Sequence, residues 1–188
     1  MIKILFSTTS FDIIDNGPAL FANILYESLQ SSDKYDIRFI SEDIKSKDEK
    51  SKLYQLNLKQ NIFNRFLFQF FRIFKYHKAA KKINSEFNFD VLVYNNAFTG
   101  VLSSLFLKKR VIVMVNDDNK IASRNMPLSL KKSYFKNKIL SYLEKIAIQK
   151  ADVVIVNSKF MKLQIENNFT VNQNKLKILI KGIDLSNY

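Results

Sequence analysis

Two acidic residues lie between two asparagines in a short segment that could carry acid–base chemistry. The segment Asn116-Asp117-Asp118-Asn119 follows an apolar run, residues 110–115, that predicts a buried strand. A carboxylate can accept a proton from an attacking hydroxyl, and two close carboxylates raise the pKa of one of them. Consecutive side chains often point apart, however, and the same residues can cap a turn. We therefore take Asn116 and Asp117 as catalytic candidates, with a capped turn as the alternative.

Amide and hydroxyl groups follow two further predicted strands. Asn95 and Asn96 come directly after an apolar run, and their amides suit a polar, sugar-like ligand. Turn formation is the alternative for both residues. Ser158 and Lys159 stand where a helix is predicted to begin, a position that can receive a phosphate. As an N-cap, Ser158 needs no such role.

A single glycine lies between the first predicted strand and the first predicted helix. Gly17 precedes Pro18, and proline is tolerated at a helix start because its missing N–H had no partner there. Glycine at this place lets backbone N–H groups approach a phosphate, or it simply makes the turn. The segment contains neither the G-x-G-x-x-G pattern of dinucleotide-binding proteins nor a P-loop.

Apolar runs that alternate with segments of helical period predict an α/β fold, with a parallel sheet wrapped by helices. The expected strands are residues 2–7, 36–41, 90–94, 110–115, 152–157 and 175–180, with a weaker strand at 53–58. Continuous Val and Ile content in 111–115 and 153–156 is typical of strands covered on both faces. Helices are expected after Gly17, over 61–85, over 130–150 and after Ser158. A chain of 188 residues is long enough for one core, so we expect one domain.

The end of the chain carries two recognisable motifs. Residues 151–158 read Ala-Asp-Val-Val-Ile-Val-Asn-Ser, and residues 180–184 read Ile-Lys-Gly-Ile-Asp. They resemble the AD-x-V-I-x-x-S strand and the I-x-N-G-V-D hinge of family-four glycosyltransferases, which have the two-domain GT-B fold. The resemblance implies that residues 1–188 are one doubly wound, Rossmann-like domain, the N-terminal half of a GT-B fold. It implies an interdomain hinge near residues 181–188.

The same resemblance implies a reaction. Family members transfer a sugar from a nucleotide-sugar to a glycan or a lipid-linked acceptor, as in polysaccharide biosynthesis, and need no metal or other cofactor. Their second domain holds most of the nucleotide-sugar site, so we expect such a domain in cis or in trans. We expect this chain to be inactive alone, as a truncated transferase or as one subunit of a split enzyme. The alternative is a noncatalytic module that binds a membrane surface or a glycan.

The resemblance also implies roles for individual residues. Asn16 and Gly17 fall where the family has a glycine-containing loop near the donor diphosphate, often with two glycines. Asn116 stands where family members commonly have a histidine that contacts the reacting sugar region, and asparagine cannot transfer a proton at neutral pH. The expected acceptor-binding residues are Asn95, Asn96, Asn116, Asp117, Ser158 and Lys159.

The composition limits which classes of binding partner the protein can have. A net charge of +13 attracts phosphates, anionic lipid headgroups or nucleic acid, although AT-rich coding also explains abundant lysine. No nucleic-acid-binding motif is present, so we expect no nucleic acid partner. The absence of cysteine and the single histidine, His77, exclude thiolate and multi-histidine metal sites, and we expect no metal. The N-terminus lacks the apolar length of a secretory signal, so we expect a cytoplasmic protein, with the inner membrane face as a second location.

The segment 61–85 combines aromatic and basic residues. Its helical stripe consists of Phe63, Phe66, Leu67, Phe70, Phe71 and Phe74. Frequent charges exclude a membrane-spanning helix. The segment is either an interfacial helix, with phenylalanines in the acyl boundary and basic residues against anionic headgroups, or a core helix whose other aromatic residues line a cleft. The expected membrane contacts are Phe68, Arg65, Arg72 and Lys75.

Overall fold

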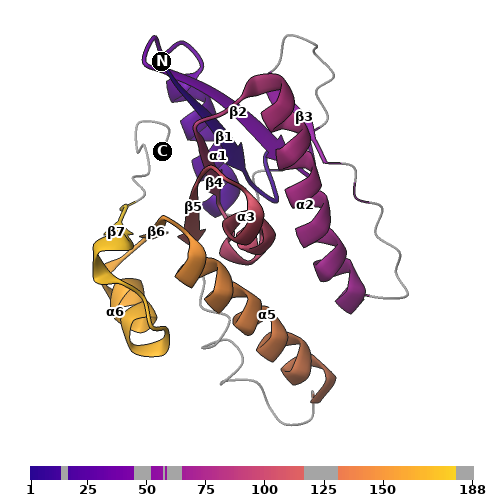
Figure 1. Ribbon diagram of the computed structural model, residues 1–188, viewed down its shortest axis with the longest axis vertical. Helices are drawn as coiled ribbons and strands as arrows, with labels where there is room; N and C mark the ends of the chain where they lie inside the picture. The colour runs from indigo at the N-terminus through magenta and orange to yellow at the C-terminus, as the bar shows by residue number, and fades with distance from the viewer. Residues whose placement is uncertain (14–16, 45–51, 57, 59–64, 117–130, 181–188) are drawn as a thin grey trace.

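The computed structural model of the chain describes residues 1–13, 17–44, 52–56, 58, 65–116 and 131–180, apart from the side chains of 65–67 and 131–137 (Figure 1). Several of the expected features therefore lie outside the described residues. These are Asn16, Asp117, the hinge at 181–188, the helix start at 61–64 and the side chains of Phe63, Phe66 and Leu67. The side chain of Arg65 is also outside them.

A seven-stranded parallel sheet forms the centre of the domain. The strands are β1 (Ile2–Ser7), β2 (Tyr35–Ser41), β3 (Leu53–Gln55), β4 (Val91–Tyr94), β5 (Arg110–Val115), β6 (Val153–Val156) and β7 (Leu176–Ile178). Their order is β3-β2-β1-β4-β5-β6-β7. The strand predictions are confirmed, although β3 and β7 are shorter than expected. The sequence order reverses around β1, which pairs with both β2 and β4.

The described helices follow β1, β3, β4, β5 and β6. They are α1 (Gly17–Leu29), α2 (Arg65–Phe87), α3 (Val101–Phe106), α5 (Lys131–Lys150) and α6 (Lys159–Asn168), with short 3₁₀ turns η2 (Ala97–Gly100) and η4 (Gln173–Lys175). The helix predictions are confirmed. Among the described residues, no helix combines the length and the apolar character needed to cross a membrane.

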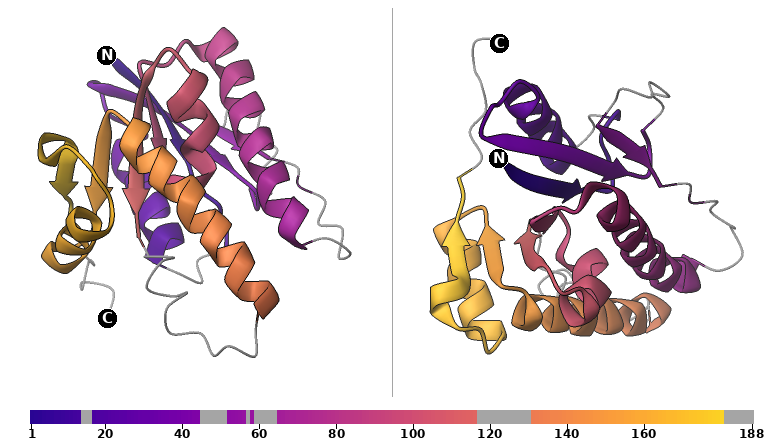
Figure 2. Two further views of the ribbon diagram at one scale, coloured as in Figure 1. Left: turned by 60° about the horizontal axis from the view of Figure 1, so that its bottom comes forward. Right: turned by 45° about the horizontal axis from the view of Figure 1, so that its top comes forward.

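The helices form two layers on the sheet. Right-handed crossovers place the connection from β1 to β2 on one face and the connections after β3 on the other, because the chain moves in opposite directions along the sheet. Figure 2 shows α1 on one side of the sheet and α2, α3 and α5 on the other. This doubly wound arrangement confirms the predicted fold class.

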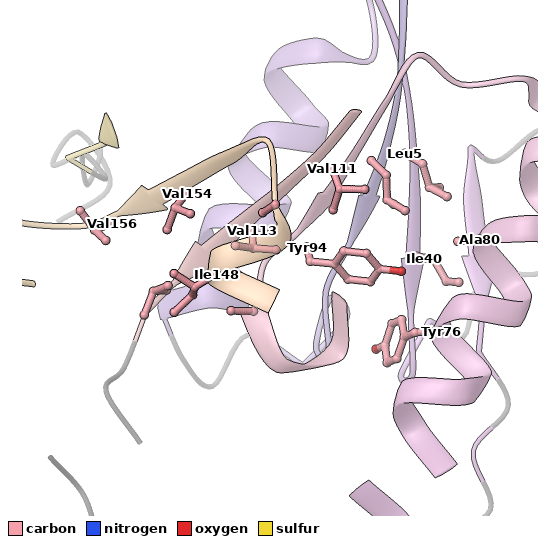
Figure 3. Close-up of a cluster of buried hydrophobic side chains, with 14 of the residues drawn as sticks. Leu5, Ile40, Tyr76, Ala80, Tyr94, Val111, Val113, Ile148, Val154 and Val156 are labelled. Atoms are coloured by element: carbon pink, nitrogen blue, oxygen red, sulfur yellow. The ribbon is translucent and has the colours of Figure 1, made fainter. Parts of the chain in front are cut away.

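The larger core cluster lies under α2, α5 and α6. Tyr94, Val113 and Val154 point from the sheet toward Tyr76 of α2 and Ile148 of α5 (Figure 3). All five side chains are fully or almost fully buried. This continuous packing fixes the helices against the strands whose carboxyl ends carry the polar candidates.

The second core cluster lies under α1 and is aromatic. Phe6 and Phe11 pack against Phe39 with ring centroids 5.3 and 5.4 Å apart, and Tyr26 of α1 closes the group at 5.5 Å from Phe39. On the same sheet face, Val93 of β4 and Ile155 of β6 are only half-buried. Coverage of the central strands is therefore uneven between the two faces, because one helix layer is larger than the other.

The buried side of α2 differs from the expected stripe. Its buried residues are Ile73, Tyr76, Ala80, Ile83 and Phe87. Phe71 and Phe74, both in the expected stripe, are 45% and 62% exposed. The two sets lie roughly a third of a turn apart at 100° per residue, so both cannot face the sheet. Tertiary packing places Ile73, Tyr76 and the other buried residues against the sheet, and Phe71 and Phe74 face outward.

Candidate functional site

A pocket of about 340 Å³ lies at the carboxyl ends of β1, β4 and β5. Its polar lining consists of Thr9, Asn95, Asn96, Asn116 and Glu144, and its apolar lining includes Pro18, Phe98, Met114 and Leu140. The pocket lies beside β1, around which the sequence order of the strands reverses. In open parallel sheets, ligands bind in the crevice at this switch point. The pocket is therefore the candidate functional site.

Asn95 holds two walls of the pocket together. Its side-chain amide donates to the Pro18 carbonyl oxygen at 2.9 Å and to Thr8 Oγ1 at 3.3 Å. Its backbone N–H donates to the Ser7 carbonyl oxygen at 2.8 Å. These bonds join the end of β4 to the end of β1 and the start of α1. Asn95 lines the pocket, and its side-chain N–H groups donate to Pro18 and Thr8 of the protein itself.

Asn116 links three strand ends. Its side-chain amide donates to the backbone oxygen of Asn95 and, at 3.3 Å, to Asn95 Oδ1. The backbone oxygen of Asn116 accepts a hydrogen bond from Asn157 Nδ2 at 3.3 Å. The structure thus brings Asn95, Asn96 and Asn116 into one pocket, as the strand positions predicted. The catalytic role of Asn116 stays a prediction.

Gly17 begins α1 next to the pocket-lining Pro18. A Cβ atom added at Gly17 would meet nothing within 4 Å. Packing among the described residues therefore does not require glycine at this position. A small residue here leaves the N-terminal end of α1 open, where backbone N–H groups and the helix dipole favour an anion.

The loop after β1 is held by a residue that sequence reasoning missed. The carboxylate of Asp43 accepts the backbone N–H groups of Phe11 at 2.7 Å and of Ile13 at 3.0 Å. The hydroxyls of Ser41 and Ser10 donate to the same carboxylate at 2.7 and 3.0 Å. Burial raises the pKa of Asp43, but these hydrogen bonds outweigh burial and hold the pKa below its ordinary value.

Ser158 and Lys159 lie at the start of α6, outside the described lining of the pocket. Ser158 Oγ accepts the backbone N–H of Met161 at 3.1 Å, which confirms the predicted N-cap. Lys159 is exposed. Acceptor binding by these two residues stays a prediction.

Glu144 is the second site residue that sequence reasoning missed. It lies on α5, is 3% exposed and lines the pocket. Its neighbours along the helix, Leu143, Ile146 and Ala147, belong to the apolar side of α5. A lone carboxylate inside an apolar helical stripe was the signal that could have revealed it.

The expected membrane contacts on α2 have different surroundings. Arg72 pairs with Glu42, and its guanidinium also lies 5.8 Å from the Phe68 ring centroid. Phe68 is half-buried. Lys75 Nζ lies 4.9 Å from the ring centroid of the exposed Phe71. Lys75 therefore lies on the outward side of α2 beside Phe71, whereas Arg72 forms an ion pair with Glu42 inside the domain.

His77 lies on α2, away from the pocket lining. Its Nδ1 is 3.1 Å from Ser103 Oγ, which is 2.7 Å from the hydroxyl of the buried Tyr94. Burial and the nearby Lys81 charge lower the pKa of His77. Within the described part of the chain, no group of three His, Cys, Asp or Glu residues could hold a metal ion.

The fold resembles several solved structures at low sequence identity. Sucrose-phosphate synthase from Thermosynechococcus elongatus superposes with a TM-score of 0.72 at 12% identity, over 98% of this chain and 49% of that chain. UDP-GlcNAc 2-epimerase from Neisseria meningitidis, bound to UDP-GlcNAc, gives a TM-score of 0.57 at 10% identity over 94% and 46%. A ugt transferase from Siraitia grosvenorii in complex with UDP gives 0.52 at 12% identity over 100% and 53%. These likenesses show the fold alone, and the chain spans about half the length of these proteins.

The sequence itself matches a family model. No curated protein matches the chain. Residues 21–187, however, match the model described as Glycosyltransferase Family 4, which covers most of the chain and includes β2 to β7, the pocket asparagines and the terminal motifs. The chain therefore belongs to glycosyltransferase family 4, with the Rossmann-like fold of the N-terminal half of a GT-B enzyme.

Proposed function

We propose that this chain is the acceptor-binding domain of a glycosyltransferase that moves a sugar from a nucleotide-sugar to a glycan or lipid-linked acceptor. The observation that carries the proposal is the polar pocket beside β1, on a family-four domain. The amide of Asn96 and the hydroxyl of Thr9 line this pocket and can hydrogen-bond acceptor hydroxyls. A pocket of about 340 Å³ suits a ligand the size of one or two sugar rings.

The donor diphosphate is assigned to the start of α1. Gly17 and Asn16 stand at this N-terminus, where the helix dipole and the first N–H groups attract phosphate. The rest of the donor requires a nucleotide-sugar domain, in cis or in trans, without which the chain is inactive. The Siraitia grosvenorii structure contains UDP, and a Phytolacca americana UGT2 structure contains UDP-2fluoro-glucose and pterostilbene. The reaction uses no metal and takes place in the cytoplasm, in polysaccharide biosynthesis.

Acceptor binding to the purified chain tests the proposal. We would titrate a panel of neutral oligosaccharides and follow the side-chain amide signals of Asn96 and Asn116 by NMR. N96A is expected to weaken binding about tenfold, the loss of roughly one hydrogen bond. N167A removes an exposed asparagine from α6 and is the matched control, with unchanged binding. Binding that N96A leaves unchanged would place the acceptor elsewhere.

A second function, contact with an anionic membrane surface, is favoured by the outward side of the larger helix layer. Phe74 of α2, Phe106 of α3 and Tyr142 of α5 are 62%, 69% and 63% exposed. His77 and Phe106 bring α2 and α3 together, with ring centroids 6.4 Å apart. Exposed aromatic residues on adjoining helices can enter the acyl boundary together.

The charge of these helices also favours contact with an anionic membrane surface. The sequences of α2, α3 and α5 contain two acidic residues, Glu86 and the buried Glu144, among many lysines. The exposed Lys78 and the half-buried Lys75 flank Phe71 and Phe74 on α2. Lysine side chains placed beside aromatic residues favour anionic headgroups.

Liposome pelleting tests the membrane contact. Wild-type chain is expected to pellet with vesicles of phosphatidylcholine and phosphatidylglycerol, less so as salt rises. F74S/F106S is expected to reduce pelleting strongly, whereas L163S, at an exposed apolar residue of α6, is the control. Equal pelleting by both variants would exclude this surface. Binding of single-stranded RNA instead of vesicles would assign the surface to nucleic acid.

A further inference from the structure

A second hollow lies at the opposite edge of the sheet from the acceptor pocket. It has a volume of about 470 Å³ and lies where α3 ends, β5 begins and α5 ends. Within the described part of the chain, Asp152 is the one acidic residue that lines it. Its basic lining residues are Lys108, Lys109, Arg110 and Lys150. We call this positively charged feature the basic hollow.

The cations of the basic hollow are not neutralised by ion pairs. The three ion pairs formed among the described residues all lie elsewhere in the fold. Lys109 Nζ donates to Oδ1 of Asn88 at 2.9 Å, and this partner is uncharged. The Asp152 carboxylate accepts the backbone N–H of Val111 at 2.8 Å. The hollow thus keeps most of its positive charge.

Compensation of the α5 dipole is the alternative explanation for Lys150. A basic residue in the last turn of a helix is favourable, because the carboxyl end of a helix is partially negative. This end already has a cation, since Lys175 Nζ donates to the backbone oxygen of Ala151 at 3.0 Å. The alternative also leaves Lys108 and Arg110 unexplained, which are exposed just before and at the start of β5. A helix end therefore does not account for the whole cluster.

Phosphate is the anion that suits this arrangement. Like charges close to one another repel, so an anion between the cations lowers the energy of the cluster. Lysine and arginine bind phosphate oxygens through charge-assisted hydrogen bonds. A phosphate monoester carries about −1.5 to −2 charges at pH 7 and has three strong acceptor oxygens. It can therefore contact several cations at once, whereas a carboxylate brings one charge and a neutral sugar none.

We propose that the basic hollow binds a phosphate monoester, at a site separate from the acceptor pocket and from the start of α1. The proposal goes beyond the glycosyl transfer proposed above and does not depend on it, because the two sites lie at opposite edges of the sheet. The phosphate has two possible sources, a soluble phosphate ester and the headgroup of an anionic lipid. Leu105 and Phe106, just before the basic residues, are 41% and 69% exposed, so the acyl chains of a bound lipid would have apolar neighbours.

Titration with glycerol 3-phosphate tests the inference. The probe is added to the full chain at low salt, and the backbone N–H signals of Lys109 and Arg110 report on the hollow. Saturable shifts at these two residues are expected, and the affinity should fall as the salt concentration rises. The N–H signals of Gly17 and Ser158 report on the starts of α1 and α6. Shifts there, without shifts at the hollow, would overturn the inference and leave the donor assignment unaffected.

Two double variants separate the hollow from the net charge of the protein. K108Q/K150Q removes two exposed charges from the hollow and is expected to weaken binding at least about tenfold, since hydrogen bonds to charged groups are the stronger kind. K81Q/K82Q removes two charges from exposed lysines of α2 outside the hollow, and is expected to keep the affinity within about twofold. Equal weakening by both variants, or none by the first, would contradict the assignment of the site.

Vesicles identify the source of the phosphate. Phosphatidylcholine vesicles that contain phosphatidic acid present the same monoester on a lipid. If a lipid is the source, K108Q/K150Q and F106S both reduce pelleting with these vesicles, whereas F106S leaves glycerol 3-phosphate binding unchanged. If only glycerol 3-phosphate depends on the hollow, the source is a soluble ester.

Two outcomes keep this inference apart from the membrane contact proposed above. Pelleting that F74S/F106S reduces and K108Q/K150Q does not, without glycerol 3-phosphate binding, keeps the membrane contact and overturns the basic hollow as a site. Binding of neither the soluble ester nor the phosphatidic acid vesicles overturns the inference as well.

Discussion

The guanidinium of Arg72 pairs with the carboxylate of Glu42, with 2.5 Å between Nη2 and Oε1 and 2.8 Å between Nε and the same oxygen. The hydroxyl of Tyr76 lies 2.9 Å from this oxygen and 2.8 Å from the backbone oxygen of Thr8. Three side chains thus connect α2 with the ends of β2 and β1. The loop that borders the pocket is therefore fixed from the same helix whose outer side carries the exposed phenylalanines.

The Arg72–Glu42 pair is expected to stabilise the domain cooperatively. Both side chains are largely buried, so removing one partner leaves the other charge without compensation. R72M and E42Q are each expected to lower the free energy of unfolding by about 2 kcal/mol, and the double variant by less than the sum. Urea unfolding measures all three. K78M, at an exposed lysine of α2, is the control, and additive single effects would contradict the coupling.

Gly100 is expected to be required for packing. A Cβ atom there would lie 2.7 Å from Cδ2 of Tyr94, whose ring is fully buried and cannot move freely. G100A should therefore lower the free energy of unfolding by about 1–3 kcal/mol, the usual cost of overpacking. G17A is the matched control, because its added Cβ meets nothing within 4 Å. Thermal unfolding compares the two, and equal stability of both variants would contradict the expectation.

The strands could be predicted because each is a short apolar run between polar turns. The orientation of α2 could not, because two overlapping apolar sets share the helix. Phe71 and Phe74 are as hydrophobic as Ile73 and Tyr76, and only the fit to the sheet decides between the sets. The sequence contains both possibilities with similar strength, and tertiary packing selects one.

Part of the site could also be predicted. Asn95, Asn96 and Asn116 follow parallel strands, whose carboxyl ends meet at one edge, so their proximity follows from topology. Glu144 could not be placed in the same way. It reaches the pocket from the middle of α5, and the position of that helix over the strand ends is a result of packing.

Asp43 is expected to make stability depend on acidic pH. Its folded-state pKa lies below the ordinary value near 3.8, so its contribution is complete above that pH and is lost as pH falls through it toward the folded-state pKa. D43N should cost about 1–2 kcal/mol at neutral pH. Its stability should change less between pH 5 and pH 3 than that of wild type. Thermal unfolding across this range checks both points, with D33N at an exposed aspartate as control.

Variants of Ser158 are expected to distinguish its role as the N-cap of α6 from a role in phosphate binding. Because its Oγ accepts the N–H of Met161, S158A should lower the free energy of unfolding by about 1 kcal/mol, and S158D should restore it since aspartate also caps. A phosphate bound at this helix start would instead be repelled by S158D. Titration with inorganic phosphate measures binding, and K159A, at an exposed residue, shows the effect of removing a charge without removing the cap. If S158D has full stability and binds phosphate as wild type does, Ser158 only caps the helix. If S158D and K159A both lose phosphate binding, a phosphate binds at the start of α6.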